Sequence, residues 1–498
     1  GGAWEDNRAL DLDSKGNVRS LLANQVARSV LFTAGPPDPG LSEAVFHVRY
    51  AGSGVLEYGN VTVISQSPGH DVIRLSKVSG PDSDLVAIVN LVQTSAQNPL
   101  RDVTMTPAGG ICRGDPFTAV GGPDACDGDY SGFAEDPEQA RFDPQFLRNL
   151  RPFASLRFMD WAGTNNSSLT SFADRALVSH QFWSTARGVP VEIMCQLCNL
   201  LAADPWFTIP HQLDGAGAEA WGALAAQELD AARKVSVEWS NEVWNSIFDQ
   251  TAYARERGVE AGLDTGGDAF VGMLRYYANR AGETHDRFET GFGDASRVRR
   301  VMASQAANDF LTTTILAQVE TAHGAGSAAS RVDLLAIAPY FGLTVTESAD
   351  AAKMKRLGVD GLFDWLLNDP AGSPAFDYGS LRQIRGVIAA QVAAARAFSV
   401  PVGSYEGGQH LVGFAGFEND DALNAIFDAA NRDPRMKQVY HAYLDDWRRQ
   451  TGQRFHHFTD VDGITKWGRW GAKEFPGQSR ANAPKYDALL TYAEASPM

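Results

Sequence analysis

Two glutamates, far apart in the sequence, each follow a run of residues that predicts a buried strand. Glu242 lies in V-S-V-E-W-S-N-E-V-W-N, residues 235–245, where Val and Trp alternate with polar residues before an Asn-Glu pair. Glu406 lies in P-V-G-S-Y-E-G-G-Q-H, beside two glycines that would let a ligand approach. A carboxyl group donates a proton when protonated and attacks as a nucleophile when ionised. If these two side chains converge, they form a catalytic pair.

Both patterns also have a purely structural interpretation. Asn and Glu often begin helices, so an Asn-Glu pair alone is a weak signal. The glycines after Glu406 are typical of a tight turn. The strand pattern before each glutamate, together with the aromatic residues around both, favours the catalytic interpretation.

The elements that must position these residues alternate between strand and helix from residue 136 to residue 498, which is typical of a parallel sheet. Predicted strands span 153–161, 189–197, 235–239, 298–304, 334–340, 400–405 and 454–459. Predicted helices span 169–186, 216–234, 310–325, 381–398, 421–431 and 435–451. This alternation predicts an α/β fold, a TIM (β/α)8 barrel, whose strands carry chemistry at their C-terminal ends. Its first strand either lies near 18–22 or 26–32 or is missing from the chain.

Residues 1–135 have a different texture and predict a β-rich accessory module. Short strands are expected at 44–50, 54–58, 60–65, 71–75, 85–92 and 102–106. Evenly spaced short strands favour a β-sandwich, which would be an insertion if the first barrel strand precedes it. The segment from 109 to 138 is expected to be a linker or a lid.

The four cysteines give information on the cellular compartment of the protein. Cys112 and Cys126 flank a loop rich in Gly, Asp and Pro, a setting that tolerates a disulfide and indicates a secreted or periplasmic protein. No signal peptide stands at the start of the sequence; it has been removed or lies upstream. Cys195 and Cys198 have redox-motif spacing, but no second such pair supports zinc, and two buried thiols are favoured.

Composition excludes several classes of function. The 498 residues are 44% hydrophobic and 21% charged, as in soluble globular proteins. A net charge of −17 argues against nucleic acid or an anionic membrane as partner, and no apolar run is long enough to span a bilayer. There is no phosphate-binding loop, dinucleotide fingerprint, G-x-S-x-G or metal-binding motif. We therefore expect no cofactor and no metal site.

Five motifs together resemble a group of bacterial barrel proteins associated with the clan A retaining glycoside hydrolases. They are R-F-M-D-W, D-P-W-F-T-I-P-H, E-W-S-N-E-V-W-N, Y-E-G-G-Q-H and W-G-R-W-G. The clan places its acid/base on strand four and its nucleophile on strand seven. With 153–161 counted as the second strand, Glu242 ends the fourth and Glu406 ends the seventh. The resemblance implies hydrolysis of β-linked sugars, or of α-L-linked arabinosides, without a cofactor.

The resemblance also implies roles for single residues. Glu242 would be the acid/base and Glu406 the nucleophile, about 5 to 5.5 Å apart. The other implied roles are a hydrogen bond to the sugar 2-hydroxyl from Asn241, a contact to the nucleophile from Tyr340, support beneath it from Arg157, and a subsite floor from Trp467 or else Trp470. Arg157 could instead pair with a carboxylate inside the barrel, and both tryptophans could be surface caps. Either Tyr340 or Tyr405 could donate the hydrogen bond that keeps Glu406 ionised.

Further aromatic and polar side chains follow the predicted strands and suit the binding of an oligosaccharide or polysaccharide. They are Trp161, Asn166, Trp206, His211, Tyr405, Gln409 and His410. The long loops favour cleavage within a chain. Two alternatives remain open: a barrel that binds glycans without cleaving them, and a transglycosylase that uses the same two glutamates.

Overall fold

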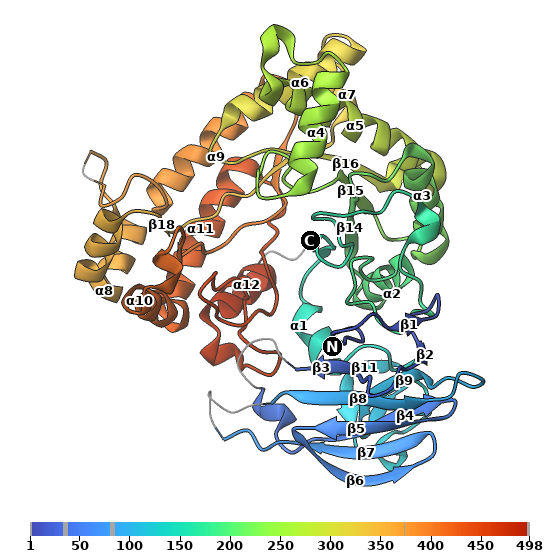
Figure 1. The fold of residues 1–498 in the computed structure, drawn as a ribbon. Helices are drawn as coiled ribbons and strands as arrows, with labels where there is room; N and C mark the ends of the chain where they lie inside the picture. Colours follow the sequence, from blue (N-terminus) through green and yellow to red (C-terminus); the bar gives the residue numbers. More distant parts are fainter. Residues whose placement is uncertain (1, 33–37, 80–84, 373, 496–498) are drawn as a thin grey trace. The chain divides into compact units, whose positions relative to one another are not determined.

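The computed structural model describes residues 2–32, 38–79, 85–372 and 374–495 (Figure 1). The chain divides into two compact units. The smaller unit comprises Gly1–Arg151, Ala176–Thr185 and Glu474–Gln478. The larger unit comprises Pro152–Arg175, Ala186–Lys473 and Ser479–Met498. Among the described residues, no helix has both the length and the apolar character needed to cross a membrane.

The larger unit is a curled parallel sheet with helices around it, similar to a TIM barrel, which confirms the predicted fold class (Figure 1). Six strands pair in chain order: β13 (Ser155–Arg157), β14 (Asp204–Ile209), β15 (Val235–Trp239), β16 (Val298–Ala303), β17 (Leu334–Ile337) and β19 (Val402–Ser404). A short parallel pair, β18 (Thr344–Val345) and β20 (Val412–Gly413), lies beyond β17 and β19.

The helices of this unit lie between and after the strands. They are α2 (Val191–Leu201), α3 (Gly215–Glu228), α4 (Asp249–Glu260), α5 (Ala269–Phe292), α6 (Asp309–His323), α7 (Ala328–Arg331), α8 (Ser348–Asn368), α9 (Leu381–Arg396), α10 (Asp421–Arg432), α11 (Arg435–Thr451) and α12 (Pro484–Ala495). The predicted helices at 216–234, 310–325, 381–398, 421–431 and 435–451 correspond to α3, α6, α9, α10 and α11.

Alternation along the strands separates two cores. On β16, Met302 belongs to the large cluster between the sheet and the helices, while Val301 and Ala303 belong to a small inner cluster. Because successive side chains of a strand point to opposite faces, the inner cluster marks the concave side of the sheet. Trp206 and Tyr405 belong to this inner cluster, so the concave side also holds the residues around the two glutamates.

The strand predicted at 189–197 is absent, and a strand that was not predicted takes its place in the sheet. The run 189–197 is not a strand but most of α2, because Pro190 begins a helix and the apolar residues after it are buried at helical spacing. The sheet contains β14 instead, which occupies most of the motif D-P-W-F-T-I-P-H. The number of strands before Glu242 is therefore unchanged, and Glu242 and Glu406 still follow strands three places apart. The predicted helix at 169–186 contains only a 3-10 turn, Phe172–Asp174.

The predicted last strand, 454–459, does not join the sheet through a backbone ladder. Its His456 connects the two edge strands instead. The ring Nδ1 donates to the Ser404 carbonyl over 2.9 Å, and Nε2 lies 3.1 Å from Ser155 Oγ. Burial lowers the pKa of His456 to about 3, so the ring is neutral. Among the described residues, the main sheet of the larger unit thus has six parallel strands rather than eight, with a side-chain bridge between β19 and β13.

The smaller unit contains two antiparallel sheets that share a core, as predicted for a sandwich. One has the order β3 (Ala27–Leu31), β8 (Ala87–Thr94), β5 (Gly54–Gly59), and the other β6 (Val61–Ser67), β7 (His70–Leu75), β4 (Val45–Ala51), β9 (Arg101–Pro107). Leu56 and Val89 of the first sheet pack in one cluster with Phe46 and Ile73 of the second. All six predicted strands are present.

Neither candidate for a first barrel strand belongs to the barrel. The 26–32 candidate is β3, which pairs antiparallel with β8, and the 18–22 candidate is β2 (Val18–Ser20), which pairs with β1 (Asp11–Leu12). The expected linker or lid at 109–138 contains a small sheet instead: β10 (Gly110–Cys112), β11 (Asp115–Val120) and β12 (Tyr130–Gly132).

The cysteines follow the sequence interpretation. Cys112 and Cys126 form a disulfide beside this small sheet. Cys195 and Cys198 are unpaired and buried in α2.

Candidate active site

The turn after β15 holds Asn241 and Glu242 in a strained backbone. Ser240 and Glu242 have positive φ angles of 63° and 42°, which L-residues rarely adopt. The buried Gln250 of α4 donates from Nε2 to the Asn241 carbonyl and to Asn165 Oδ1, both over 2.8 Å. Such conformations persist only where the surroundings hold them, and they cluster at functional sites.

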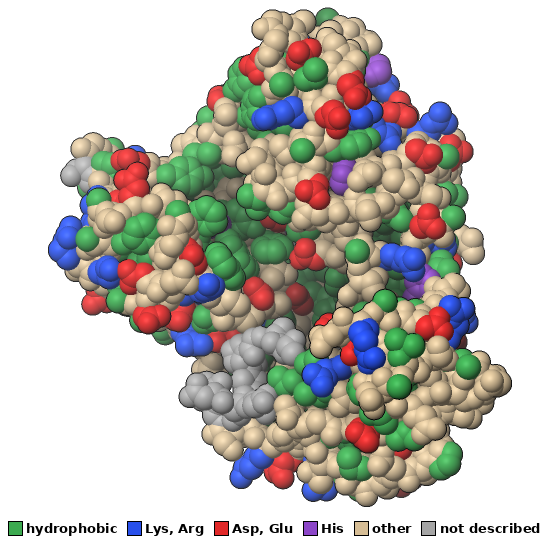
Figure 2. All heavy atoms as spheres, in the orientation of Figure 1, with side chains coloured by type: hydrophobic (Ala, Val, Ile, Leu, Met, Phe, Trp, Pro, Cys, Tyr) green, Lys and Arg blue, Asp and Glu red, His purple; other side chains and the backbone are tan. Residues whose placement is uncertain are grey.

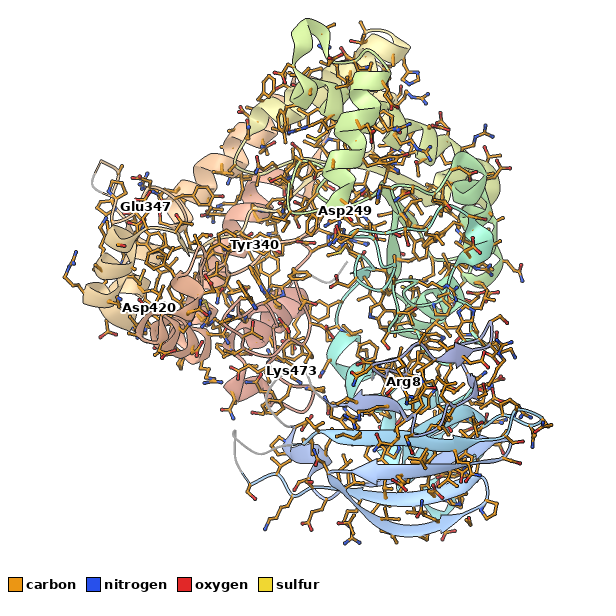
Figure 3. The ribbon with its side chains drawn as sticks, viewed as in Figure 1. Arg8, Asp249, Tyr340, Glu347, Asp420 and Lys473 are labelled. Atoms are coloured by element: carbon orange, nitrogen blue, oxygen red, sulfur yellow. A yellow bond between two sulfur atoms is a disulfide. The ribbon has the colours of Figure 1, made fainter. Side chains whose placement is uncertain are left out.

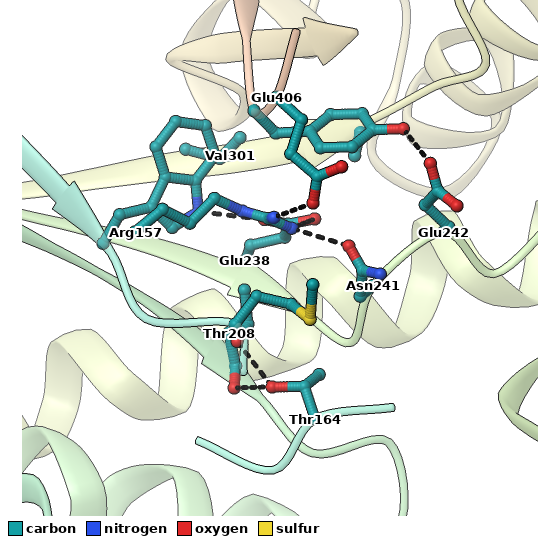
Figure 4. A network of polar contacts seen from close by, with 12 residues as sticks. Arg157, Thr164, Thr208, Glu238, Asn241, Glu242, Val301 and Glu406 are labelled. Carbon is teal, nitrogen blue, oxygen red and sulfur yellow. Dashed lines mark hydrogen bonds and ion pairs between the residues drawn. The ribbon is translucent and has the colours of Figure 1, made fainter. Parts of the chain in front are cut away.

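Arg157, at the end of β13, connects the turn to Glu406 (Figure 4). Its Nη1 donates to Glu406 Oε1 over 2.8 Å, and its Nη2 donates to Asn241 Oδ1 over 2.8 Å. Its Nε and Nη2 also donate to the two oxygens of Glu238, over 3.0 and 3.1 Å. The guanidinium lies 4.9 Å from the centre of the Tyr405 ring. One buried cation therefore joins three strand ends.

Glu238 is a residue of this network that sequence reasoning missed. It is 1% exposed, and its Oε2 also accepts a hydrogen bond of 2.9 Å from Trp206 Nε1. Burial raises the pKa of Glu238, whereas the guanidinium of Arg157 acts in the opposite direction. The available signal was a charged residue inside a strand that was expected to be buried, because a buried charge needs a partner. That partner is Arg157, as the sequence alternative of a carboxylate pair in the barrel anticipated.

Glu406 follows β19 and is 8% exposed. Its Oε2 accepts a hydrogen bond of 2.9 Å from the Tyr340 hydroxyl. Burial and the nearby charge of Glu242 raise the pKa of Glu406 to about 7, although Arg157 and Tyr340 favour its ionised form. Burial and the adjacent carboxylate raise the pKa of Tyr340 well above its ordinary value, so its hydroxyl keeps its proton and can donate.

The glycines after Glu406 are required for packing. A Cβ on Gly407 would lie 2.5 Å from the Phe455 ring, and one on Gly408 would lie 2.9 Å from Tyr440 and His457. They let the turn that carries Glu406 lie against α11 and the 454–459 segment. That they also let a ligand approach the carboxylate stays a prediction.

Glu242 has partners of its own. The Tyr405 hydroxyl donates to Oε1 over 2.7 Å (Figure 4). Asn245 Nδ2 donates to Oε2 over 2.9 Å. The two tyrosines thus divide between the two glutamates, Tyr405 with Glu242 and Tyr340 with Glu406. Asn245 was missed, although its position three residues after Glu242 in N-E-V-W-N was available as a signal.

A cavity of about 430 Å³ opens beside Glu242, at the C-terminal ends of β15, β16, β17 and β19. Figure 3 marks Tyr340, one of its lining residues, and Figure 2 shows hydrophobic side chains gathered in a hollow in this part of the larger unit. Its lining consists of Glu242, Trp244, Asn245, Ser246, Gln305, Ala306, Ala307, Ala338, Tyr340, Gly342, Thr344, Tyr378, Tyr405 and His410.

Several predicted substrate contacts do lie at this cavity. Tyr405, Tyr340 and His410 line it. Trp470 packs against both the Tyr340 and His410 rings, at centroid distances of 5.6 and 4.7 Å. Trp467, the first choice for a subsite floor, is 56% exposed, and its ring lies 4.7 Å from the ammonium group of Lys466.

Other predicted contacts are not brought to the cavity. Trp206 and His211 are each 1% exposed, and Gln409 is 2% exposed, so their side chains are enclosed by protein. Gln409 Oε1 accepts from the Leu411 backbone. The Asn166 side chain accepts from the backbone of Asp249 at the start of α4.

Trp161 packs its ring against Phe158 at a centroid distance of 5.5 Å. Among the described residues, no group of three or more His, Cys, Asp or Glu side chains is arranged to hold a metal ion.

No protein-family model and no curated protein sequence matches the chain. Among solved structures it is similar to a 4-O-α-L-rhamnosyl-β-D-glucuronidase from Fusarium oxysporum, with 12% identity and a TM-score of 0.39, covering 70% of this chain and 64% of that one. A broad-specificity endoglucanase from Bacteroides salanitronis gives 12% identity and a TM-score of 0.37, covering 70% of this chain and 84% of that one.

A third similar structure is an endo-1,4-β-D-mannanase from Thermotoga petrophila, with 11% identity and a TM-score of 0.27, covering 69% of this chain and 99% of that one. The chain is thus structurally similar, at low identity, to glycoside hydrolases. At these scores the similarity carries no argument about activity, which must come from the site.

Proposed function

We propose that this protein is a retaining glycoside hydrolase that cleaves a β-linked polysaccharide or oligosaccharide within the chain. The observation that carries the proposal is the Arg157 network, in which one guanidinium bonds Glu406 and the Asn241 beside Glu242. These residues come from three strand ends on the concave side of one sheet, where barrel enzymes place their chemistry. Each glutamate accepts a hydrogen bond from its own tyrosine, Glu406 from Tyr340 and Glu242 from Tyr405.

The proposed reaction has two displacements. In the first, protonated Glu242 gives its proton to the glycosidic oxygen while the bond from that oxygen to the anomeric carbon breaks, and ionised Glu406 bonds to that carbon. In the second, Glu242 takes a proton from water, the water oxygen bonds to the anomeric carbon, and Glu406 leaves as a carboxylate. Arg157 and Tyr340 stabilise the negative charge on Glu406 before and after the reaction. We expect Asn241, whose Oδ1 accepts from Arg157 and whose Nδ2 donates to Asn165, to bond the sugar 2-hydroxyl through the second hydrogen of Nδ2.

The test is to trap the covalent intermediate. A panel of β-linked polysaccharides identifies a substrate, and a 2-fluoro glycoside of the same sugar is then incubated with the protein. We expect peptide mass spectrometry to find the label on Glu406. Product analysis by NMR should show the anomer of the substrate retained. A label on another residue, or an inverted product, contradicts the mechanism.

Substitution provides the first prediction. Glu406→Gln and Glu242→Gln should each lower turnover by orders of magnitude, because each removes a group that exchanges a proton or bonds to the sugar. The far-ultraviolet circular dichroism spectrum should be unchanged. Near-normal activity of either variant would exclude the proposed pair, and undiminished glycan binding without any turnover in the natural protein would favour a binding protein. Longer products formed from short acceptors would favour a transglycosylase.

We further propose that the protein is secreted or periplasmic, a proposal supported by the Cys112–Cys126 disulfide. Thiol labelling of the protein from its native source should modify two of the four cysteines after unfolding. Labelling of all four without a reductant would contradict this location.

A further inference from the structure

The lining of the cavity includes Glu242 but not Glu406. Glu242, Trp244, Asn245 and Ser246 line it directly, whereas Glu406 does not and its hydrogen-bond partner Tyr340 does. An acid that protonates the departing oxygen must face the part of the substrate that leaves. Given the proposed function, the cavity is therefore positioned for the leaving group rather than for the sugar that bonds to Glu406.

The lining of the cavity suits a sugar ring. Trp244, Tyr378 and Tyr405 supply aromatic surface, and Ser246, Gln305 and Thr344 supply hydroxyl and amide groups. Aromatic faces cover the apolar side of a sugar, while hydroxyl and amide groups bond its hydroxyls. The volume of about 430 Å³ falls within the range of small-molecule sites, about 300–1,000 Å³.

The charges of the site disfavour an acidic sugar. Among the described residues that line the cavity there is no Lys or Arg, so the carboxylate of a uronic acid would lose its hydration without gaining a cationic partner. The nearby guanidinium of Arg157 is already bonded to Glu238, Glu406 and Asn241. His410 is held neutral, because burial lowers its pKa to about 4. An uncharged sugar needs no cationic partner.

Tyr378 is held at the cavity by its neighbours in the chain. It lies in the connection between α8 and α9, and the following Gly379 accepts a backbone hydrogen bond of 2.9 Å from Gly342. The contact is so close that a Cβ on Gly379, whose φ is 114°, would lie 1.7 Å from the Gly342 oxygen. Ser380 then begins α9 with a capping box to Gln383. The backbone that follows Tyr378 is therefore held in place, and Tyr378, a residue that is 40% exposed, lines the cavity.

We propose that this cavity is the subsite for the leaving part of the substrate, that it takes an uncharged sugar, and that Tyr378 is a specificity-determining residue of this subsite. The proposal rests on the proposed function and adds to it the ligand class of one side of the site.

The experiment compares two substrates in the Tyr378→Ala variant. One is a β-linked oligosaccharide, and the other is the glycosyl fluoride of the same sugar, whose leaving fluoride does not fill the subsite. We expect kcat/KM for the oligosaccharide to fall roughly 10- to 100-fold, and that for the fluoride to change less than about twofold. Phe414→Ala is the matched control, because Phe414 is an aromatic residue, 56% exposed, that does not line the cavity. Equal losses on both substrates, or no loss on either, would overturn the role of Tyr378.

A second arm tests the charge. Two substrates share the same reacting sugar, and their leaving sugars are a hexose and the corresponding uronic acid. We expect at least about tenfold faster cleavage of the hexose form, because the uronic carboxylate would be desolvated without a cationic partner. Equal cleavage of both forms would overturn the preference for an uncharged sugar while leaving the hydrolase intact.

Failure of the proposed function would be distinguishable. If the natural protein cleaves neither the fluoride nor any oligosaccharide, the hydrolase proposal is wrong. Calorimetry then measures the binding of neutral and uronic oligosaccharides to the natural protein and to Tyr378→Ala. Binding of the neutral form that weakens in the variant would support the subsite, and absence of binding would overturn it.

Discussion

At the scale of single residues, the arrangement of donors around the carboxyl groups matters more than the presence of the carboxyl groups. Arg157 bonds Glu406 and Glu238 at once, and each of these anions influences the other through it. Glu406 is buried beside two other glutamates and is kept ionisable only by the guanidinium and the Tyr340 hydroxyl. Its ionisation should therefore respond to changes at residues that never touch the substrate.

The pH dependence of activity follows from this. The proposed nucleophile acts as a carboxylate, and the pKa of Glu406 in the free protein is about 7. Below that pH the group is protonated and cannot attack, so the rising limb of kcat/KM should lie near pH 7. The measurement is a pH profile of kcat/KM with a neutral substrate. A profile already level at pH 5 would contradict this pKa for the nucleophile.

Two substitutions should move this rising limb in opposite directions. Tyr340→Phe removes a hydrogen bond to the carboxylate, which should move the limb to higher pH. Glu238→Gln removes a negative charge that disfavours ionisation of Glu406, which should move the limb to lower pH. The same pH profiles measure both. A loss of activity at all pH values without any shift would mean that Glu238 only supports the fold.

At the scale of elements, the tight packing of the turn that carries Glu406 should contribute to the free energy of unfolding. Gly407→Ala places a Cβ 2.5 Å from the Phe455 ring, and such overpacking costs about 1–3 kcal/mol. The free energy of unfolding in urea should fall by that amount, and turnover should fall with it because Glu406 is displaced. The control is Gly386→Ala within α9, where a Cβ meets nothing within 4 Å. That variant should be neutral or stabilised by up to about 1 kcal/mol. Equal stability of the two variants would contradict the tight packing.

Hydrophobic periodicity predicts some of the observed strands and helices and fails for others. The strand 235–239 was predictable because its apolar residues alternate, and α11 because its buried residues follow a helical period. The run 189–197 is apolar on nearly every residue, so its period is ambiguous, and it was assigned to the wrong class. β14 begins with Asp-Pro, which is typical of a turn.

The candidate site was predictable in its carboxyl groups but not in its contacts. Glu242, Glu406 and Arg157 stand out by position at strand ends. Two features were not predictable: which tyrosine bonds which glutamate, and the burial of Trp206 and His211. Both depend on the direction of side chains from the backbone, for which the sequence pattern carries no signal.

At the scale of the whole molecule, the chain contains two compact units with separate cores. The cavity and both glutamates belong to the larger unit, and the Cys112–Cys126 disulfide belongs to the smaller one. A ligand that binds only the folded larger unit stabilises that unit by mass action. A disulfide that closes a loop of this length, with a sequence separation of 14, stabilises by about 3 kcal/mol, mainly by restricting the unfolded chain. A ligand should therefore change the stability of the larger unit, and reduction of the disulfide should change that of the smaller unit.

Calorimetry should separate the unfolding transitions of the two units. We expect two unfolding transitions, because two units with separate cores need not unfold together. A neutral oligosaccharide should raise the midpoint of one transition only, and dithiothreitol should lower the midpoint of the other only. Cys112→Ser/Cys126→Ser without reductant should reproduce the effect of dithiothreitol, and a Cys195→Ser/Cys198→Ser variant should keep the response to it. A single transition shifted by both reagents would show that the two units unfold as one cooperative structure, and the disulfide would then stabilise the part of the molecule that holds the cavity.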